Sequence, residues 1–154
     1  MQALYEPTLE SLKQHPLPDW FGDAKLGIMV SWGLYSIPAW AVPCGPQPEV
    51  AKKKGYRYVY RNNPYAEFYW NTQKIKESPT CQFHFQTYGE QFAYPDFANQ
   101  FNAAAERWDP EAWANQFSGI GARYVVLVSK HHDGFLLWPS QIPNPAKTAA
   151  TMAP

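Results

Sequence analysis

The feature that most constrains the fold of this chain is a continuous apolar run, YVVLVSK, at residues 124–130. The run is rich in β-branched residues and does not alternate between polar and apolar side chains, which is typical of a strand buried on both faces. A second short apolar run, LGIMVSWG at residues 26–33, is bounded by glycines and predicts another buried strand. Strands of this kind occur in parallel sheets covered by helices, so the two runs favour an α/β fold.

The clearest predicted helix lies between the two strands, in WDPEAWANQFSGIG at residues 108–121. Asp109 is expected to cap the free backbone N–H groups, and Pro110 suits the first helical position. Trp113 and Phe117 form an apolar stripe one helical turn apart, and a glycine ends the helix. The order strand, helix, strand implies a right-handed parallel crossover.

The remaining segments give weaker signals. A short helix is expected at residues 8–14, and another at residues 64–76, where a proline occupies the first turn. Asp96 is expected to cap a further helix. Residues 38–64 are rich in Pro, Gly and Lys and predict a long excursion with little regular structure, except for strand-like character in YRYVY at residues 56–60.

The chain divides into a polar lead-in at residues 1–19, a domain at residues 20–140 and an irregular Pro- and Ala-rich tail at residues 141–154. The lead-in has no apolar segment of the kind found in signal peptides, and no run is long enough to cross a membrane. We therefore expect no membrane partner and, by default, a cytoplasmic location. The net charge is zero and no basic stripe stands out, so nucleic acid is not expected as a partner.

The strongest candidate for a functional site is KHHDGFLLW at residues 130–138, directly after the second predicted strand. In α/β folds the active site lies at the carboxyl ends of strands. Neutral imidazoles such as those of His131 and His132 each offer one donor and one acceptor, which suits a polyhydroxylated ligand. Asp133 could be functional, or it could orient a histidine or bond the turn backbone before Gly134. A metal site would need further ligands, so neither a metal nor another cofactor is predicted.

A second candidate is SWGLYSIPAW at residues 31–40, at the end of the first predicted strand. Trp32, Tyr35 and Trp40 could form the apolar wall of a ligand site, or they could pack under the long loop. Aromatic residues make up 17% of the chain, which indicates either a large aromatic core or a cleft that stacks against sugar rings.

A third candidate is YAEFYWN at residues 65–71, where aromatic residues surround Glu67. A carboxyl group in such a setting is a candidate for acid–base chemistry if the site is dry. The alternative is a surface carboxylate in the first turn of a helix, which the helix dipole favours.

Together these segments resemble the N-terminal part of family 29 glycoside hydrolases, the α-L-fucosidases. The likeness runs from about residue 20 to residue 140, and its most specific part is DPEAW followed by the YVVL strand and HHDGF. The resemblance implies a (β/α)₈ barrel of the TIM type, with fucose bound at the carboxyl ends of the strands and a fucoside or fucosylated glycan as the partner.

The resemblance also implies roles for individual residues. His131 and His132 match the family's fucose-binding histidine pair. Glu67 matches the Glu of its Glu-Trp pair, and Phe68 stands where Trp is usual. Ser31 stands where the family usually has a ligand-binding histidine, and a serine is shorter and does not titrate near neutral pH. Together with the two tryptophans of residues 31–40, these residues form the expected substrate-binding set.

A complete barrel of this type needs roughly 250 residues, and only two strands are predicted here. We therefore expect a partial barrel with about two parallel strands and several helices. Two parallel strands leave their edges and faces exposed, which favours completion by homo-oligomerisation. Retaining hydrolysis needs two carboxyl groups roughly 5–5.5 Å apart, and in the family both come from beyond residue 154. Glu67 and Asp133 are the candidates for catalysis because they flank the predicted sugar site.

Three functional hypotheses follow from the sequence. The first is an α-L-fucosidase that is active as an oligomer. The second is a non-catalytic oligomer that binds fucose or has a purely structural role, which the lack of matches to the family's catalytic carboxyls favours. The third is a chain whose barrel is completed by a second chain.

Overall fold

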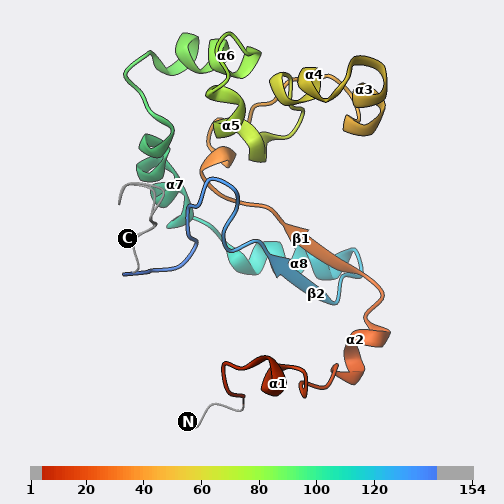
Figure 1. The fold of residues 1–154 in the computed structure, drawn as a ribbon. Helices are drawn as coiled ribbons and strands as arrows, with labels where there is room; N and C mark the ends of the chain where they lie inside the picture. The colour runs from red at the N-terminus through yellow and green to blue at the C-terminus, as the bar shows by residue number, and fades with distance from the viewer. Residues whose placement is uncertain (1–4, 142–154) are drawn as a thin grey trace. The chain divides into compact units, whose positions relative to one another are not determined.

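The computed structural model describes residues 5–141, and it has an α/β architecture (Figure 1). Helices are labelled α, short 3₁₀ helices η and strands β. In chain order the elements are α1 (Leu9–Leu12), α2 (Asp19–Asp23), β1 (Gly27–Val30), η1 (Leu34–Ser36), α3 (Gln47–Lys54), α4 (Tyr56–Arg61), η2 (Ala66–Phe68), α5 (Tyr69–Gln73), α6 (Pro79–Tyr88), η3 (Tyr94–Asp96), α7 (Phe97–Ala105), α8 (Pro110–Gly119) and β2 (Tyr124–Leu127).

The two predicted strands are confirmed, and they pair with each other in parallel (Figure 1). The amide of Arg123 donates to the carbonyl oxygen of Leu26 at 2.9 Å before the strands, and the amide of Val128 donates to Val30 at 3.0 Å after them. Helix α8 lies between the strands in the sequence, at the position predicted for it. The carboxyl ends of β1 and β2 therefore lie at the same edge of the sheet.

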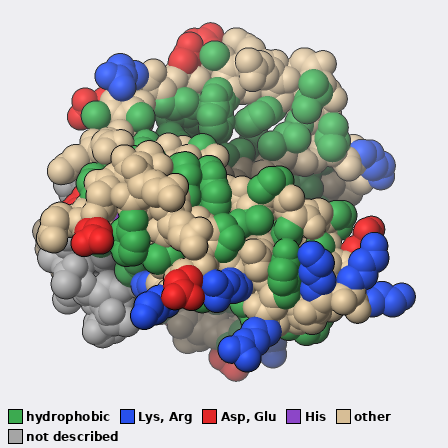
Figure 2. Space-filling model, turned by 90° about the horizontal axis from the view of Figure 1, so that it is seen from above, with side chains coloured by type: hydrophobic (Ala, Val, Ile, Leu, Met, Phe, Trp, Pro, Cys, Tyr) green, Lys and Arg blue, Asp and Glu red, His purple; other side chains and the backbone are tan. Residues whose placement is uncertain are grey.

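The prediction that both strands are buried on both faces is wrong for the part of the chain that the structure describes. Met29 in β1 is 70% exposed, and Val125 and Leu127 in β2 are 49% and 46% exposed. Within residues 5–141 no third strand pairs with this sheet, so apolar side chains remain at the surface. In Figure 2 apolar side chains, in green, are visible at several places on the face shown.

The described chain forms two compact units, and each is considered by itself. The first unit runs to Ile28 and includes Pro110–Val126. Its aromatic contacts include Phe21 with Tyr124, whose ring centroids are 5.3 Å apart. Gly27 lets the Tyr124 ring lie against the backbone, because a Cβ atom at that position would overlap the ring.

The second unit holds an aromatic core and comprises Met29–Asp109 and the chain from Leu127 onwards. Phe97 is fully buried, and its ring packs edge-on against Tyr88 and Phe92, each with a centroid distance of 4.9 Å. Much of the aromatic content of the sequence is therefore used for packing. The buried cluster consists of Leu34, Tyr35, Tyr69, Tyr94, Phe97, Phe101 and Phe135.

The segment YRYVY is helical, so its predicted strand character is wrong, as is the expectation of little regular structure around it. It forms α4, which follows α3 after Gly55, a glycine with φ +81°. The aromatic rings of Tyr56 and Tyr60 lie on one face, 6.4 Å apart, and both are exposed, while Val59 is buried. The tyrosines are one helical turn apart, so the segment follows the period of a helix and not the alternation of side chains in a strand.

Other helix predictions are confirmed in part. The helix expected near the N-terminus is α1, where Thr8 Oγ1 accepts from the amide of Ser11 at 3.2 Å. The helix expected at residues 64–76 is shorter and divides into η2 and α5. Asp96 does not cap α7, because its carboxylate accepts from the amide of Ala93 at 2.7 Å instead.

The predicted tail, residues 141–154, lies outside the described residues apart from its first residue. Among the helices of the described chain, none has the length and apolar character that a membrane span requires.

Candidate functional site

The paired histidines lie at the tip of a tight loop that follows β2 in the second unit. Lys130 and Leu136 form an antiparallel bridge, and the amide of Leu137 donates to the carbonyl oxygen of Ser129 at 2.9 Å. Residues 129–137 are here called the histidine loop. Because both sides of its base are hydrogen-bonded, the loop presents its tip beyond the carboxyl end of β2.

The tip of the histidine loop is a hydrogen-bonded turn. The amide of Gly134 donates to the carbonyl oxygen of His131 at 3.0 Å, and Gly134 has a φ of +77°. Asp133 Oδ1 accepts from the amide of Phe135 at 3.0 Å. The Asp133 carboxylate therefore holds the backbone on the far side of the turn from the histidines.

The second oxygen of Asp133 is also occupied. Asp133 is 5% exposed, and its Oδ2 accepts from the hydroxyl of Tyr94 at 2.7 Å. Burial raises the pKa of Tyr94 far above its usual range, and the negative charge of Asp133 raises it further. These contacts favour the interpretation in which Asp133 bonds the turn backbone, and its catalytic role stays a prediction.

The imidazoles pack against one another and against an aromatic ring from η2. The ring centroids of His131 and His132 are 4.7 Å apart, and the Phe68 ring lies 5.1 Å from His132 and 6.3 Å from His131. Three of the residues predicted to bind substrate thus come together from two distant parts of the sequence. His132 is exposed and His131 is half-buried, so the pair is open to a ligand on one side.

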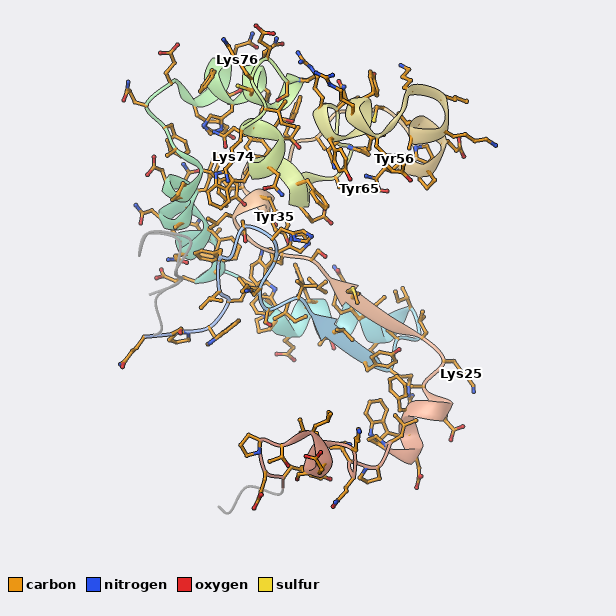
Figure 3. All side chains as sticks on the ribbon, viewed as in Figure 1. Lys25, Tyr35, Tyr56, Tyr65, Lys74 and Lys76 are labelled. Carbon is orange, nitrogen blue, oxygen red and sulfur yellow. The ribbon has the colours of Figure 1, made fainter. Side chains whose placement is uncertain are left out.

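Two buried polar atoms beside the histidine pair have no hydrogen-bond partner in the described structure: the Tyr35 hydroxyl and His131 Nδ1. The two rings meet edge-on, with a centroid distance of 5.5 Å. Figure 3 labels Tyr35, which belongs to η1 and is 3% exposed. Buried polar groups in proteins are nearly always paired, so a ligand or a water molecule is expected to bond to these atoms.

The pKa of Tyr35 also depends on the carboxylates around the site. Burial raises the pKa of Tyr35 well above its usual range. The negative charges of Glu67 and Asp133 raise it further, each by less than burial does. Glu67 is half-buried in η2 and acts electrostatically on the same hydroxyl as Asp133. The sequence pattern assigned Tyr35 to an apolar wall or to packing under the long loop, and it gave no role to the hydroxyl. Its hydroxyl was the available signal, since a phenol at a strand end can donate as well as pack.

The two predicted tryptophans are engaged in packing. The Trp32 ring lies 5.1 Å from Phe101 and 5.0 Å from Trp108, and Trp40 stacks on Phe83 at 4.5 Å with an interplanar angle of 7°. These contacts favour the packing interpretation over a sugar-binding wall, and their substrate-binding role stays a prediction.

Ser31, the remaining predicted ligand residue, directly follows β1 and is exposed. The carboxyl ends of β1 and β2 lie at one edge of the sheet, so this serine emerges at the same edge as the histidine loop. The proposed contact of Ser31 with a sugar stays a prediction.

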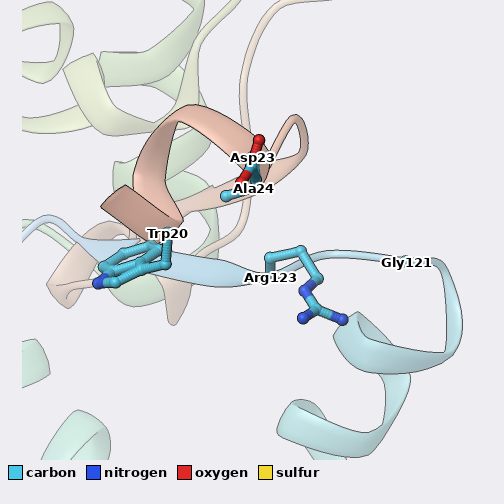
Figure 4. Close-up of a pocket in the computed structure, with 5 residues that line it drawn as sticks. All are labelled: Trp20, Asp23, Ala24, Gly121 and Arg123. Carbon is cyan, nitrogen blue, oxygen red and sulfur yellow. The ribbon is translucent and has the colours of Figure 1, made fainter. Parts of the chain in front are cut away.

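A separate pocket lies in the first unit (Figure 4). Its volume is about 710 Å³, and apart from Ala24 its lining is exposed. The histidine loop belongs to the second unit, so this pocket is not the candidate site. The lining residues are Trp20, Asp23, Ala24, Gly121 and Arg123.

Within residues 5–141 no group of three or more His, Cys, Asp and Glu side chains could hold a metal ion. His84 is part of the aromatic core, where its Nε2 donates to the carbonyl oxygen of Phe92 at 2.7 Å. Its Nδ1 then accepts from the hydroxyl of Tyr69 at 3.0 Å, so both ring nitrogens are satisfied.

Comparison with known proteins gives the family. The α-L-fucosidase family model matches residues 1–154 of the chain. The chain belongs to the α-L-fucosidase family. Tissue α-L-fucosidase of Rattus norvegicus is 39% identical over 138 residues, which cover 90% of this chain and 24% of the relative. The α-L-fucosidase of Dictyostelium discoideum is 36% identical over 140 residues, which cover 89% of this chain and 26% of the relative.

Solved structures of α-L-fucosidases are also similar. The Thermotoga maritima α-fucosidase in complex with fucose has a TM-score of 0.70 and 47% identity, covering 89% of this chain and 29% of that chain. The α-L-fucosynthase of the same organism, in complex with a fucose-containing disaccharide azide, has a TM-score of 0.75 and 47% identity. The predicted family resemblance is therefore confirmed, and the chain spans about a quarter of the length of its curated relatives.

Proposed function

We propose that this member of the α-L-fucosidase family binds α-L-fucose through the histidine loop, as part of a glycoside hydrolase site. The observation that carries the proposal is the meeting of His131, His132 and Phe68, with the Tyr35 hydroxyl and His131 Nδ1 left unpaired beside them. The names of the similar proteins support fucose as the sugar, since one of them was solved with fucose bound.

The chemistry of the site suits a sugar. A hydroxyl group of fucose can accept from one partner and donate to another, and both unpaired atoms can form such bonds. His131 Nδ1 and the Tyr35 hydroxyl would each bond a sugar hydroxyl, while the Phe68 ring would contact an apolar face of the sugar. Binding would thereby relieve the cost of two unsatisfied buried groups.

We infer that β1 and β2 are part of a (β/α)₈ barrel wall that is completed by further strands. The exposure of Met29, Val125 and Leu127 supports this proposal, because apolar side chains on both strands are left without cover in the described chain. Copies of this chain in a homo-oligomer, or a second chain, would supply the cover.

Hydrolysis with retention needs two carboxyl groups, one as nucleophile and one as acid and base. Glu67 is the better candidate for one of these roles, because it is half-buried and acts electrostatically on the unpaired Tyr35 hydroxyl. Asp133 is the weaker candidate, because protein donors occupy both of its oxygens. That occupancy favours a second function, a non-catalytic fucose-binding protein.

Calorimetry with L-fucose tests the binding proposal. We expect wild-type chain to bind L-fucose in preference to D-glucose, and His131→Ala to weaken binding by about 10- to 100-fold, as expected for the loss of one or two buried hydrogen bonds. His15→Ala is the matched control, since His15 is exposed and belongs to the first unit. An absence of heat with fucose, or equal affinities for the two variants, would contradict fucose binding at this loop.

Hydrolysis of an aryl α-L-fucoside separates the two functions. Turnover that is lost in Glu67→Gln supports the glycosidase, whereas fucose binding without turnover supports the non-catalytic protein. Turnover that survives in both Glu67→Gln and Asp133→Asn excludes these carboxyls from catalysis.

A further inference from the structure

Tyr94 connects the histidine loop to another segment of the second unit. Its hydroxyl donates to Asp133 Oδ2 at 2.7 Å across 39 positions of sequence. Tyr35, the buried phenol beside the histidine pair, also acts electrostatically on Tyr94 and raises its pKa, after burial and Asp133. One phenol hydroxyl therefore connects the segment around residue 94 to the carboxylate beneath the histidine turn.

The core fixes where the Tyr94 hydroxyl lies. Tyr94 is 2% exposed, and its ring stacks on Trp70 at a centroid distance of 5.1 Å and an angle of 8°. Tyr69 stacks on it at 6.2 Å and 29°. Lys74, labelled in Figure 3, holds its ammonium group 3.6 Å from the centroid of the Trp70 ring. A ring held in this way has little freedom to follow Asp133 if the histidine loop shifts.

The Asp133 carboxylate depends on this donor. A buried carboxylate is costly unless hydrogen bonds satisfy its oxygens, and only Oδ1 is satisfied from within the histidine loop. Oδ1 holds the amide of Phe135, whose ring packs against Phe101 at 5.4 Å. Removal of the Tyr94 hydroxyl would leave Oδ2 buried without that donor, so the carboxylate would turn towards water and release the Phe135 amide.

We infer that Tyr94 is a positioning residue for the paired histidines and acts on them through Asp133. Its hydroxyl bonds the Asp133 carboxylate, which in turn bonds the backbone of the turn that carries both histidines. The ligand part of this inference rests on the proposed fucose site, whereas its effect on the histidine loop does not.

Tyr94→Phe tests the inference, with Tyr69→Phe as the matched control. Both phenols are buried, at 2% and 1% exposure, and the Tyr69 hydroxyl bonds His84 Nδ1 away from the histidine loop. In Tyr94→Phe we expect hydrogen exchange at the Gly134 and Phe135 amides to become about tenfold faster, after correction for any change in global stability. A factor of this size is expected when one hydrogen bond to a charged group is lost. In Tyr69→Phe these amides should exchange as in wild type once the change in global stability is subtracted.

NMR signals of the imidazole rings and fucose affinity give two further readouts. In Tyr94→Phe the ring signals of His131 and His132 should shift and the affinity for L-fucose should fall about tenfold. In Tyr69→Phe both should stay near the wild-type values. A wild-type chain that binds no fucose would refute the proposed function, yet the exchange and ring signals would still test the positioning role.

Unchanged exchange at Phe135 in folded Tyr94→Phe, together with unchanged imidazole signals, would overturn the inference. If Tyr94→Phe does not fold, Asp133→Asn replaces the charged contact with a neutral one of the same shape. We then expect exchange at Phe135 to quicken several-fold. Exchange equal to that of wild type in this variant would equally overturn the inference.

Discussion

The turn that presents the histidines depends on the backbone of Gly134. This residue is buried, has a φ of +77° and donates its amide to the carbonyl oxygen of His131. A residue with a side chain adopts this left-handed region at a cost of about 1–2 kcal/mol. The glycine therefore contributes to the site through conformation rather than through contact.

Gly134→Ala should lower the free energy of unfolding by about 1–2 kcal/mol and weaken fucose binding, because the turn is strained or rearranged. Gly119→Ala is the control, since a Cβ atom at Gly119 would meet open space and the residue belongs to α8. We expect that variant to be neutral or more stable by roughly 0.5 kcal/mol. Urea unfolding measures both, and equal effects of the two variants would contradict the role of the left-handed conformation.

At the scale of single residues, the sequence named three side chains that the structure brings together, but not the residues that support them. His131, His132 and Phe68 meet as the strand-end position and the family motif suggested. The roles of Tyr35 and Tyr94 were missed because they come from contacts between segments far apart in the chain, such as the bond from Tyr94 to Asp133. Local sequence patterns carry no information on such pairings.

Among the elements, α6 shows how one capping residue joins two helices. Ser78 precedes α6 and is fully buried. Its hydroxyl oxygen accepts from the amide of Cys81 at 3.0 Å, and the hydroxyl donates to the carbonyl oxygen of Thr72 in α5 at 2.6 Å. The serine thereby satisfies a free amide of α6 and a carbonyl group of α5 together.

Ser78→Ala should lower the free energy of unfolding by about 2–3 kcal/mol, since it removes a cap and leaves a buried carbonyl group without its donor. Thr8→Ala removes the equivalent cap of α1, where the side chain of the exposed Thr8 accepts from the amide of Ser11. We expect a loss of at most about 1 kcal/mol there. Denaturant unfolding compares the two variants, and equal losses would show that burial of the cap does not matter.

The sequence predicted some elements well and others poorly, for identifiable reasons. Both strands were predicted from continuous apolar runs, and α8 was predicted from an apolar stripe between a proline and a glycine. Helix α4 was missed because a run as short as YRYVY fits either period, and β-branched and aromatic residues favour strands. The helix is favoured because Val59 is buried and because the chain can begin a helix after Gly55. The local sequence pattern reveals neither feature.

For the whole molecule, the sequence predicted the family and the α/β class but not the exposure of the sheet. The apolar runs of β1 and β2 have the composition of strands covered on both faces, yet Met29 and Val125 are exposed in the described chain. The composition of a strand indicates whether it is suited to be covered on both faces. The exposure of its side chains shows how much of that cover the described residues provide. The difference between the two is the basis for the proposal that further strands complete the sheet, whereas the aromatic core belongs to the second unit.

That core contains three buried tyrosines whose ionisation is coupled to unfolding. Burial raises the pKa of Tyr35, Tyr69 and Tyr94 above the ordinary value of 10.0, because it disfavours the phenolate. In the folded chain these residues keep their protons above pH 10, whereas in the unfolded chain they lose them. The folded state then binds more protons than the unfolded state, so stability falls as the pH rises through this range.

The free energy of unfolding should therefore fall above about pH 10 by about 1.4 kcal/mol per pH unit for each of these tyrosines, or about 4 kcal/mol per unit for all three. Below about pH 9 they should contribute no slope, since both states are protonated there. Denaturant unfolding across this range, followed by phenolate absorbance, measures the slope. Tyr35→Phe should remove about a third of it, whereas Ser78→Ala should lower stability at every pH and leave the slope unchanged. If all the phenols ionised while the chain stayed folded, the tyrosines of the second unit could not be buried as the structure has them.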